Sequence, residues 1–289
     1  MLTEGTTTNR LLVSGWLVAE DRDTPYDGSR RTENPLNERT EIRVWLLTAD
    51  VRLTPRSGLQ VSATLPDVTR SAVVTRADGS RIDFRERFRG LGDTAIILWH
   101  RLPVRRGWNV TLNGGLSLPT GKTEAPRFRD TLVDGSLVPT SRLQRGTGTF
   151  DPILGASANR VVARILPPGV RMFSSAAARL PLSENTHGLR TGASWEVGAG
   201  GSREFRQSGL GHNVIGIVRG GWLHRERDTF DGAPVLVGGG DWITIAPALA
   251  AGFGTWTVQA EVKLPVWRSL ANRQLDSSRV LQIGVVKAF

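Results

Sequence analysis

The chain ends on an apolar-rich run, Val280-Leu281-Gln282-Ile283-Gly284-Val285-Val286-Lys287-Ala288-Phe289. With the period of two that a β-strand imposes, Leu281, Ile283, Val285 and Phe289 share one face, and the other face is mostly small or polar. A strand of a transmembrane barrel has this pattern, because its lipid side is apolar and its inner side is polar. A terminal aromatic residue also suits a closing strand that ends at a membrane–water interface. The run therefore predicts a transmembrane β-barrel.

Other segments repeat this alternation along the chain. In 108-118, Trp108, Val110 and Leu112 oppose Asn109 and Thr111, and the segments 59-65, 189-197 and 255-264 alternate in the same way. Weaker candidates lie at 10-19, 41-53, 93-102, 150-162, 170-180, 212-224, 241-251 and 278-289. About twelve strands result, and single-chain outer-membrane barrels have an even number. We predict an all-β fold, a single antiparallel up-and-down transmembrane barrel spanning residues 1-289.

The connections between these segments fall into two alternating classes. Short ones lie at 54-57, 103-107, 166-169 and 252-254, with 200-209 a longer exception, and long polar ones lie at 20-40, 71-92, 120-149, 181-188, 225-240 and 266-277. This sorting predicts short periplasmic turns and long extracellular loops, 120-149 being the longest, and a periplasmic segment at 1-9. A soluble sandwich has no reason to sort its loops in this way.

Composition narrows the class of protein. Of 289 residues, 39% are hydrophobic and the mean hydropathy is -0.19, and no window approaches the roughly 18 to 20 apolar residues of a membrane-spanning helix. No cysteine is present, which rules out disulfides and thiolate sites. The first residues show no basic segment followed by an apolar one, so no signal peptide is visible. The expected location is nevertheless the bacterial outer membrane.

The net charge of +10 and the pI of about 11.3 come almost entirely from scattered arginines. A nucleic-acid groove needs clustered basic residues with interleaved aromatics, so we expect no nucleic-acid partner. A solvated surface that faces lipopolysaccharide explains the excess more simply. The expected partners are outer-membrane lipid and lipopolysaccharide, the barrel-assembly machinery during insertion, and a small-molecule solute.

Two groups of residues are candidate sites. Period-two placement predicts that charged residues face the lumen, since an Arg or Lys at the bilayer midplane costs about 2 to 4 kcal/mol; the candidates are Arg101, Arg190, Glu196, Arg219, Glu261 and Lys263. These side chains would attract anions, or would pair with one another and plug a narrow barrel. The predicted interface aromatics are Trp99, Trp108, Trp195 and Trp256 on the periplasmic side, Trp222, Trp242 and Trp267 on the extracellular side, and Phe289. The alternative for the tryptophans is that they fill a core.

Catalytic and cofactor motifs are weak. The segment Gly115 to Thr123 resembles a phosphate loop, but its first glycine is displaced by one residue and Pro126 disfavours the helix that such a loop needs. Barrels of about this size can carry a Ser–His hydrolase on the outer wall, yet the histidines, at 100, 187, 212 and 224, have no metal spacing and no partnered serine motif. We expect no enzyme, no cofactor and no metal.

Four motifs occur in order: Ser57-Gly58-Leu59-Gln60-Val61-Ser62-Ala63-Thr64-Leu65-Pro66, Gly90-Leu91-Gly92-Asp93, Leu116-Ser117-Leu118-Pro119-Thr120-Gly121-Lys122 and Arg145-Gly146-Thr147-Gly148-Thr149-Phe150-Asp151. In this order they resemble the outer-membrane transporter-like family linked to the meta-pathway of phenol degradation. The resemblance covers roughly residues 50-160 and implies an outer-membrane barrel that transports aromatic or other apolar compounds. It implies no catalytic residues.

The function predicted from these features is passive uptake or efflux of small solutes through a polar lumen, with long loops as gates. Family resemblance points to apolar or aromatic solutes, and lumen charge points to anions. The alternative is a structural outer-membrane barrel with a closed pore that scaffolds or anchors a partner complex. A soluble β-rich binding protein is a third class, which extraction without detergent would reveal.

Overall fold

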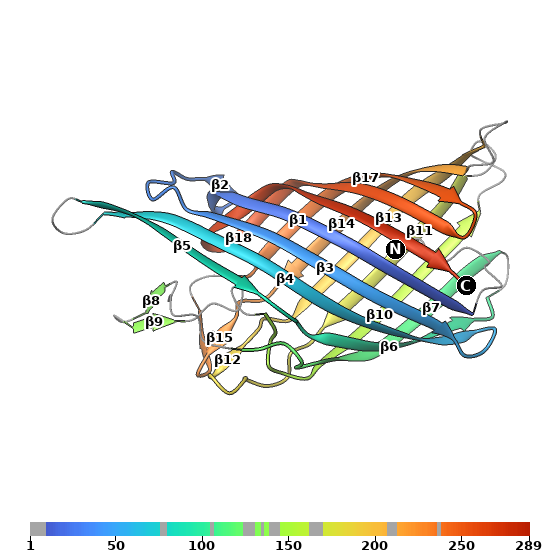
Figure 1. Cartoon of the computed structure of the whole chain (residues 1–289), viewed down its shortest axis with the longest axis horizontal. Helices are drawn as coiled ribbons and strands as arrows, with labels where there is room; N and C mark the ends of the chain where they lie inside the picture. The colour runs from blue at the N-terminus through green and yellow to red at the C-terminus, as the bar shows by residue number, and fades with distance from the viewer. Residues whose placement is uncertain are drawn as a thin grey trace.

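The computed structural model describes residues 10–75, 80–104, 107–123, 131–133, 136–138, 145–161, 170–206, 213–235 and 238–289. These residues form an antiparallel β-barrel (Figure 1). The order around the wall is β18-β17-β14-β13-β11-β10-β7-β6-β4-β3-β1, and β18 pairs with β1 to close it. The wall strands are β1 (Leu11–Gly28), β3 (Arg39–Arg52), β4 (Ser57–Thr75), β6 (Thr94–Leu102), β7 (Trp108–Leu118), β10 (Asp151–Val161), β11 (Val170–Arg179), β13 (Ser194–Arg206), β14 (Asn213–Arg225), β17 (Gly240–Phe253) and β18 (Trp256–Ala288).

The last strand, β18, makes two passes. Its first limb pairs with β17, from Phe253↔Trp256 to Gly240↔Leu270, and its second limb pairs with β1, from Gly28↔Leu270 to Leu12↔Ala288. The two limbs lie side by side, since the Ala288 amide donates a hydrogen bond to the Thr255 carbonyl (2.9 Å). Eleven strand elements thus close the barrel with twelve passes of the chain. The predicted fold class and approximate strand number are confirmed.

The remaining strands lie outside the closed wall. β2 (Arg30–Arg31) pairs with the end of β1, and β5 (Arg81–Arg89) pairs with the upper half of β4. Two small sheets are formed by β8 (Thr131–Val133) with β9 (Ser136–Val138), and by β12 (Leu189–Arg190), β15 (Thr229–Phe230) and β16 (Ala233–Pro234). None of the described residues forms a helix that is long and apolar enough to cross a membrane.

The two ends of the barrel differ as predicted. The connections 53–56 and 254–255 are short and lie at one end, here called the periplasmic end, where β1 begins and β18 finishes. The opposite, extracellular end carries the long segments. Three segments predicted as loops, 20-40, 71-92 and 266-277, are in large part paired strand, and this prediction was wrong. The strands β1, β4 and β18 are therefore longer than predicted. In these segments polar or charged residues occur on both strand faces, so the period of two does not predict a strand there. The segment 1-9 and half of 120-149 lie outside the described residues.

The wall is apolar outside and small or polar inside. Large exposed apolar residues recur at every second position of the wall strands, including Trp45 (50% exposed), Leu98 (59%) and Leu249 (63%). Their chain neighbours face the interior, as Ala248 and Ala250 do on β17. A soluble protein buries its large apolar residues instead, so this inverted pattern is that of a barrel surrounded by lipid.

Aromatic side chains inside the barrel lie over glycines of neighbouring strands. Register places Trp16 beside Gly284, Trp99 beside Gly58, and Phe173 beside Gly200. A Cβ at any of the three glycines would overlap the ring next to it. These glycines therefore let bulky rings lie flat against the wall, which keeps them out of the centre of the lumen.

Replacing Gly284 by valine should destabilise the barrel, because the added methyl groups displace the Trp16 ring from the wall. Overpacking of this kind costs about 1 to 3 kcal/mol. The same replacement at Gly252 of β17 is the control, since nothing lies within 4 Å of a Cβ there. Urea unfolding in lipid, followed by tryptophan fluorescence, measures both. Equal stability of the two variants would contradict the packing role of Gly284.

Candidate functional site

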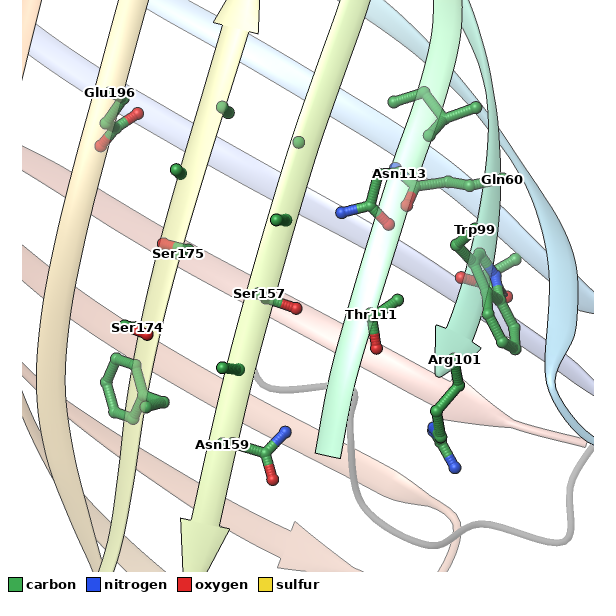
Figure 2. A pocket seen from close by; sticks show the side chains of 18 of the residues that line it. Gln60, Trp99, Arg101, Thr111, Asn113, Ser157, Asn159, Ser174, Ser175 and Glu196 are labelled. Carbon is green, nitrogen blue, oxygen red and sulfur yellow. Dashed lines mark hydrogen bonds between the residues drawn. The ribbon is translucent and has the colours of Figure 1, made fainter. Parts of the chain in front are cut away.

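A cavity of about 450 Å³ lies inside the barrel and contacts nearly every wall strand. Its position follows from small residues on the inner faces of β10, β11 and β13, where register aligns Gly155, Ala177, Ser157, Ser175 and Gly198. The hydroxyl and amide groups of Thr111, Asn113, Ser157, Asn159 and Ser175 lie across this wall (Figure 2). The lumen thus contains an open space whose wall combines small and apolar residues with hydroxyl, amide and charged groups.

The structure places the predicted lumen residues as follows. Arg101, Glu196, Arg219 and Glu261 line the cavity, and Lys263 lies on the same face of β18 as Glu261. Arg190 does not, and this prediction is corrected. It belongs to β12 in a small sheet outside the barrel wall, where its Nε lies 3.4 Å from Thr229 Oγ1. The barrel strand that was expected to include it begins only at Ser194.

The lumen charges pair along the wall. Arg219 of β14 binds Glu261 of β18 at 2.6 Å. The strand β17 lies between them, and register aligns its Ala246 with Arg219 and its Ala248 with Glu261. Lys263 of β18 binds Glu196 of β13 at 3.4 Å, across β17 and β14. Glu196, Arg219 and Glu261 also line the cavity, so these pairs form part of its wall. Further ion pairs line the extracellular half of the inner wall, among them Arg22–Glu20 on β1, Arg70–Glu38 beside β4 and Arg268–Asp276 on β18.

Four arginines line the periplasmic part of the cavity, and we call them the arginine arc: Arg10, Arg52, Arg101 and Arg171. Each lies within two residues of the periplasmic end of β1, β3, β6 or β11. Within the described part of the chain, none has a carboxylate within ion-pair distance. Asp50, the acidic residue among them, accepts a hydrogen bond from Trp99 Nε1 (3.1 Å) and attracts Arg52. The arc therefore carries a positive excess.

Sequence reasoning identified only Arg101 of this arc. The alternation of the strands could have identified two of the others. Arg52 lies on the same strand face as Asp50 and Thr48, and Arg171 lies on the same strand face as Ser175. Both lie at strand ends, where an outward arginine can reach water and the lipid-cost argument loses its force.

The predicted interface aromatics divide into two groups. Trp108, Trp222, Trp256, Trp267 and Phe289 are exposed on the outer surface, between 39% and 56%. At the periplasmic end the Lys287 ammonium lies 4.8 Å from the Trp256 ring and 4.5 Å from that of Phe289. Such rings with a nearby cation suit the membrane–water boundary.

Three aromatic predictions are corrected. Trp99 lines the cavity, because it lies on the same face of β6 as Arg101. Trp242 shares the inner face of β17 with Thr244, and its Nε1 donates to Asp276 (2.8 Å). Trp195 lies at the extracellular end of β13 instead of the periplasmic end, 5.4 Å from the His224 ring. The presence of a tryptophan near a strand end therefore does not show whether its ring faces the lipid or the lumen.

One serine and one histidine do meet on the outer wall. Ser57 Oγ lies 2.8 Å from His100 Nδ1 at the periplasmic end. Among the described residues, however, no carboxylate hydrogen-bonds to His100, so the third member of a hydrolase triad is missing. The described residues also hold no cluster of three or more His, Cys, Asp or Glu that could bind a metal ion.

The family motifs converge on one inner-wall cluster at the extracellular end, here called the motif cluster: Asp93, Ser117, Thr147, Asp151 and Arg179. Asp151 is fully buried and binds Arg179 at 2.6 Å. Arg179 also donates to Ser117 Oγ (3.1 Å) and lies 3.5 Å from Asp93. Thr147 donates to Asp93 through both its amide and its hydroxyl, each at 2.8 Å. The cluster ties segment 145–149 to β6, β7, β10 and β11.

Comparison with known proteins supports the fold. No protein-family model and no curated protein matches the chain. Among solved structures, an outer-membrane channel of Pseudomonas putida F1 is similar with a TM-score of 0.68 and 13% identity, covering 99% of this chain and 97% of that one. The β domain of the Bordetella autotransporter BrkA is similar with a TM-score of 0.52 and 11% identity, covering 97% and 100%. With its closed wall and outer apolar surface, the chain is an outer-membrane β-barrel.

Proposed function

We propose that the barrel is a passive channel for small solutes that favours organic anions. The observation that carries this proposal is the 450 Å³ cavity with the arginine arc on its wall. A positive excess along a water-filled path attracts anions and raises their local concentration. Phe173 and Ile217, which pack together and line the cavity, add apolar surface for the body of a solute. The motif resemblance, which implies apolar or aromatic solutes, agrees with this second feature.

The experiment is reconstitution of the full chain into planar lipid bilayers. We expect a steady single-channel current, and in a salt gradient a reversal potential whose sign indicates anion preference. In liposomes, the increase in uptake over protein-free liposomes should be largest for benzoate, smaller for benzyl alcohol and smallest for benzylamine, because the three probes differ mainly in charge. Absence of current and of any increase in uptake would overturn the channel and favour the alternative, a closed barrel that scaffolds a partner complex. Equal increases for the three probes would overturn the anion preference alone.

A further inference from the structure

The outer face of the β3–β4–β5 extension is strongly charged. In Figure 1, β4 and β5 run together past the neighbouring strands at the extracellular end. Register aligns Arg43 with Asp67 and Arg89, and Arg39 with Ser71 and Arg85. Because cross-strand partners share a face, five arginines lie together on this surface, which we call the arginine ladder: Arg39, Arg43, Arg85, Arg87 and Arg89.

The ladder lies directly above the apolar outer surface. Trp45 follows Arg43 on the same face of β3 and is 50% exposed, and its partner Leu65 on β4 is 38% exposed. Two residues along a strand span about 7 Å. The change from Trp45 to Arg43 therefore marks the upper edge of the hydrocarbon layer, and the ladder lies at the level of the outer-leaflet headgroups.

The ladder holds more cations than the carboxylates beside it can pair. Asp21 binds Arg43 at 2.9 Å and Arg39 at 3.5 Å, and Glu41 binds Arg39 at 3.2 Å. Asp67 binds Arg87 through both of its oxygens, and it also attracts Arg89, which lies opposite it on β5, and Arg43. Among the described residues, Arg85 and Arg89 have no carboxylate within ion-pair distance and both are exposed. With Asp83, which lies two residues from Arg85 on the same face of β5, five guanidinium groups share this surface with four carboxylates.

We propose that the arginine ladder binds the lipid A phosphates of lipopolysaccharide, with Arg85 and Arg89 as the principal donors. A guanidinium group matches two oxygens of a phosphate with parallel hydrogen bonds, and it does so best next to a hydrocarbon surface that keeps the lipid in place. The apolar surface at Trp45 and Leu65 supplies a place for the acyl chains. This site is on the outside of the wall and is independent of passage through the lumen.

The test measures lipid A binding to the detergent-solubilised full chain by native mass spectrometry. The variant is Arg85→Ser with Arg89→Ser, and the matched control is Arg160→Ser with Arg203→Ser. Both control arginines stack on outward rings near the periplasmic ends of their strands, Arg160 on Trp108 at 5.7 Å and Arg203 on Phe205 at 5.3 Å. Dephosphorylated lipid A and inorganic phosphate are the comparison probes.

We expect bisphosphorylated lipid A to bind the ladder variant about tenfold or more weakly than it binds the unaltered chain and the control. Dephosphorylated lipid A should bind all three proteins alike and weakly, and inorganic phosphate should show no saturable binding. The proposal is overturned if the ladder variant keeps full affinity, if dephosphorylated lipid A binds as tightly, or if the control loses as much. Saturable binding of inorganic phosphate alone would place a free-anion site there instead.

Discussion

Replacing Arg52, Arg101 and Arg171 by glutamate should reverse the ion selectivity of the channel. The three residues line the cavity near its periplasmic end and have no ion-pair partner among the described residues. Their replacement converts a positive wall into a negative one, and nearby charges act strongly in a lumen bordered by a low-dielectric wall. Reversal potentials in a salt gradient should therefore change sign, from anion preference to cation preference.

The matched control places the same change of charge outside the wall, as Arg85→Glu, Arg87→Glu and Arg89→Glu on β5. These residues are exposed on the outer face. Arg190→Glu is a second control, because that residue belongs to a small sheet outside the barrel wall. Both controls should keep anion preference. An unchanged sign in the lumen variant would show that the arginine arc does not border the ion path.

Replacing Asp151 by alanine should destabilise the protein more than any other single change of a carboxylate in the lumen wall. Asp151 is fully buried and accepts from Arg179 (2.6 Å), from Thr149 Oγ1 (2.5 Å) and from Thr147 Oγ1 (3.2 Å). Its removal takes the acceptor from Thr149 Oγ1 and breaks the short Arg179 pair, while Thr147 Oγ1 keeps Asp93 and Arg179 keeps Ser117 Oγ. Loss of one partner of a buried pair costs about 3 to 5 kcal/mol, and the 37% exposure of Arg179 reduces this to about 2 to 3 kcal/mol.

Urea unfolding in lipid measures this loss, with Glu196→Ala as the comparison. Glu196 also lies on the lumen wall and has one cationic partner, but its side chain is 47% exposed and the pair with Lys263 is longer, at 3.4 Å. Removing it should cost about 0 to 1 kcal/mol. In the double variant Asp151→Ala with Arg179→Ala, the second change should add little, because the pair is already broken. Additive losses would show that the two side chains act separately.

Much of the fold was predictable from single segments. The segments 108-118 and 255-264 alternate so regularly that lipid on one side and water on the other explain every position. The segment 94–102 was harder, since Ile96, Ile97, Leu98 and Trp99 are apolar on both faces. Its parity is nevertheless fixed by Arg101, and applying that parity to Trp99 would have placed the ring inside the lumen.

The candidate site was predictable only in part. Glu196, Arg219 and Glu261 could be assigned to the lumen because a charge on the lipid side is costly. Their partners could not be assigned, since Arg219 reaches Glu261 across an intervening strand. The motif cluster was likewise visible as separate motifs, while the contact of Asp93 with Thr147 joins residues that are distant in the chain.

By itself, then, the sequence determined that the chain is a barrel in a membrane. Each strand residue faces either lipid or lumen, so apolar and polar residues alternate with a period of two within each strand. The terminal run from Val280 to Phe289 shows this alternation as clearly as any segment. Only the tertiary structure decided where the lumen is open, which charges pair, and where the arginine arc and the arginine ladder lie. Those features depend on the register between strands and on the size of the residues on neighbouring strands. The alternation within a single strand determines neither of them.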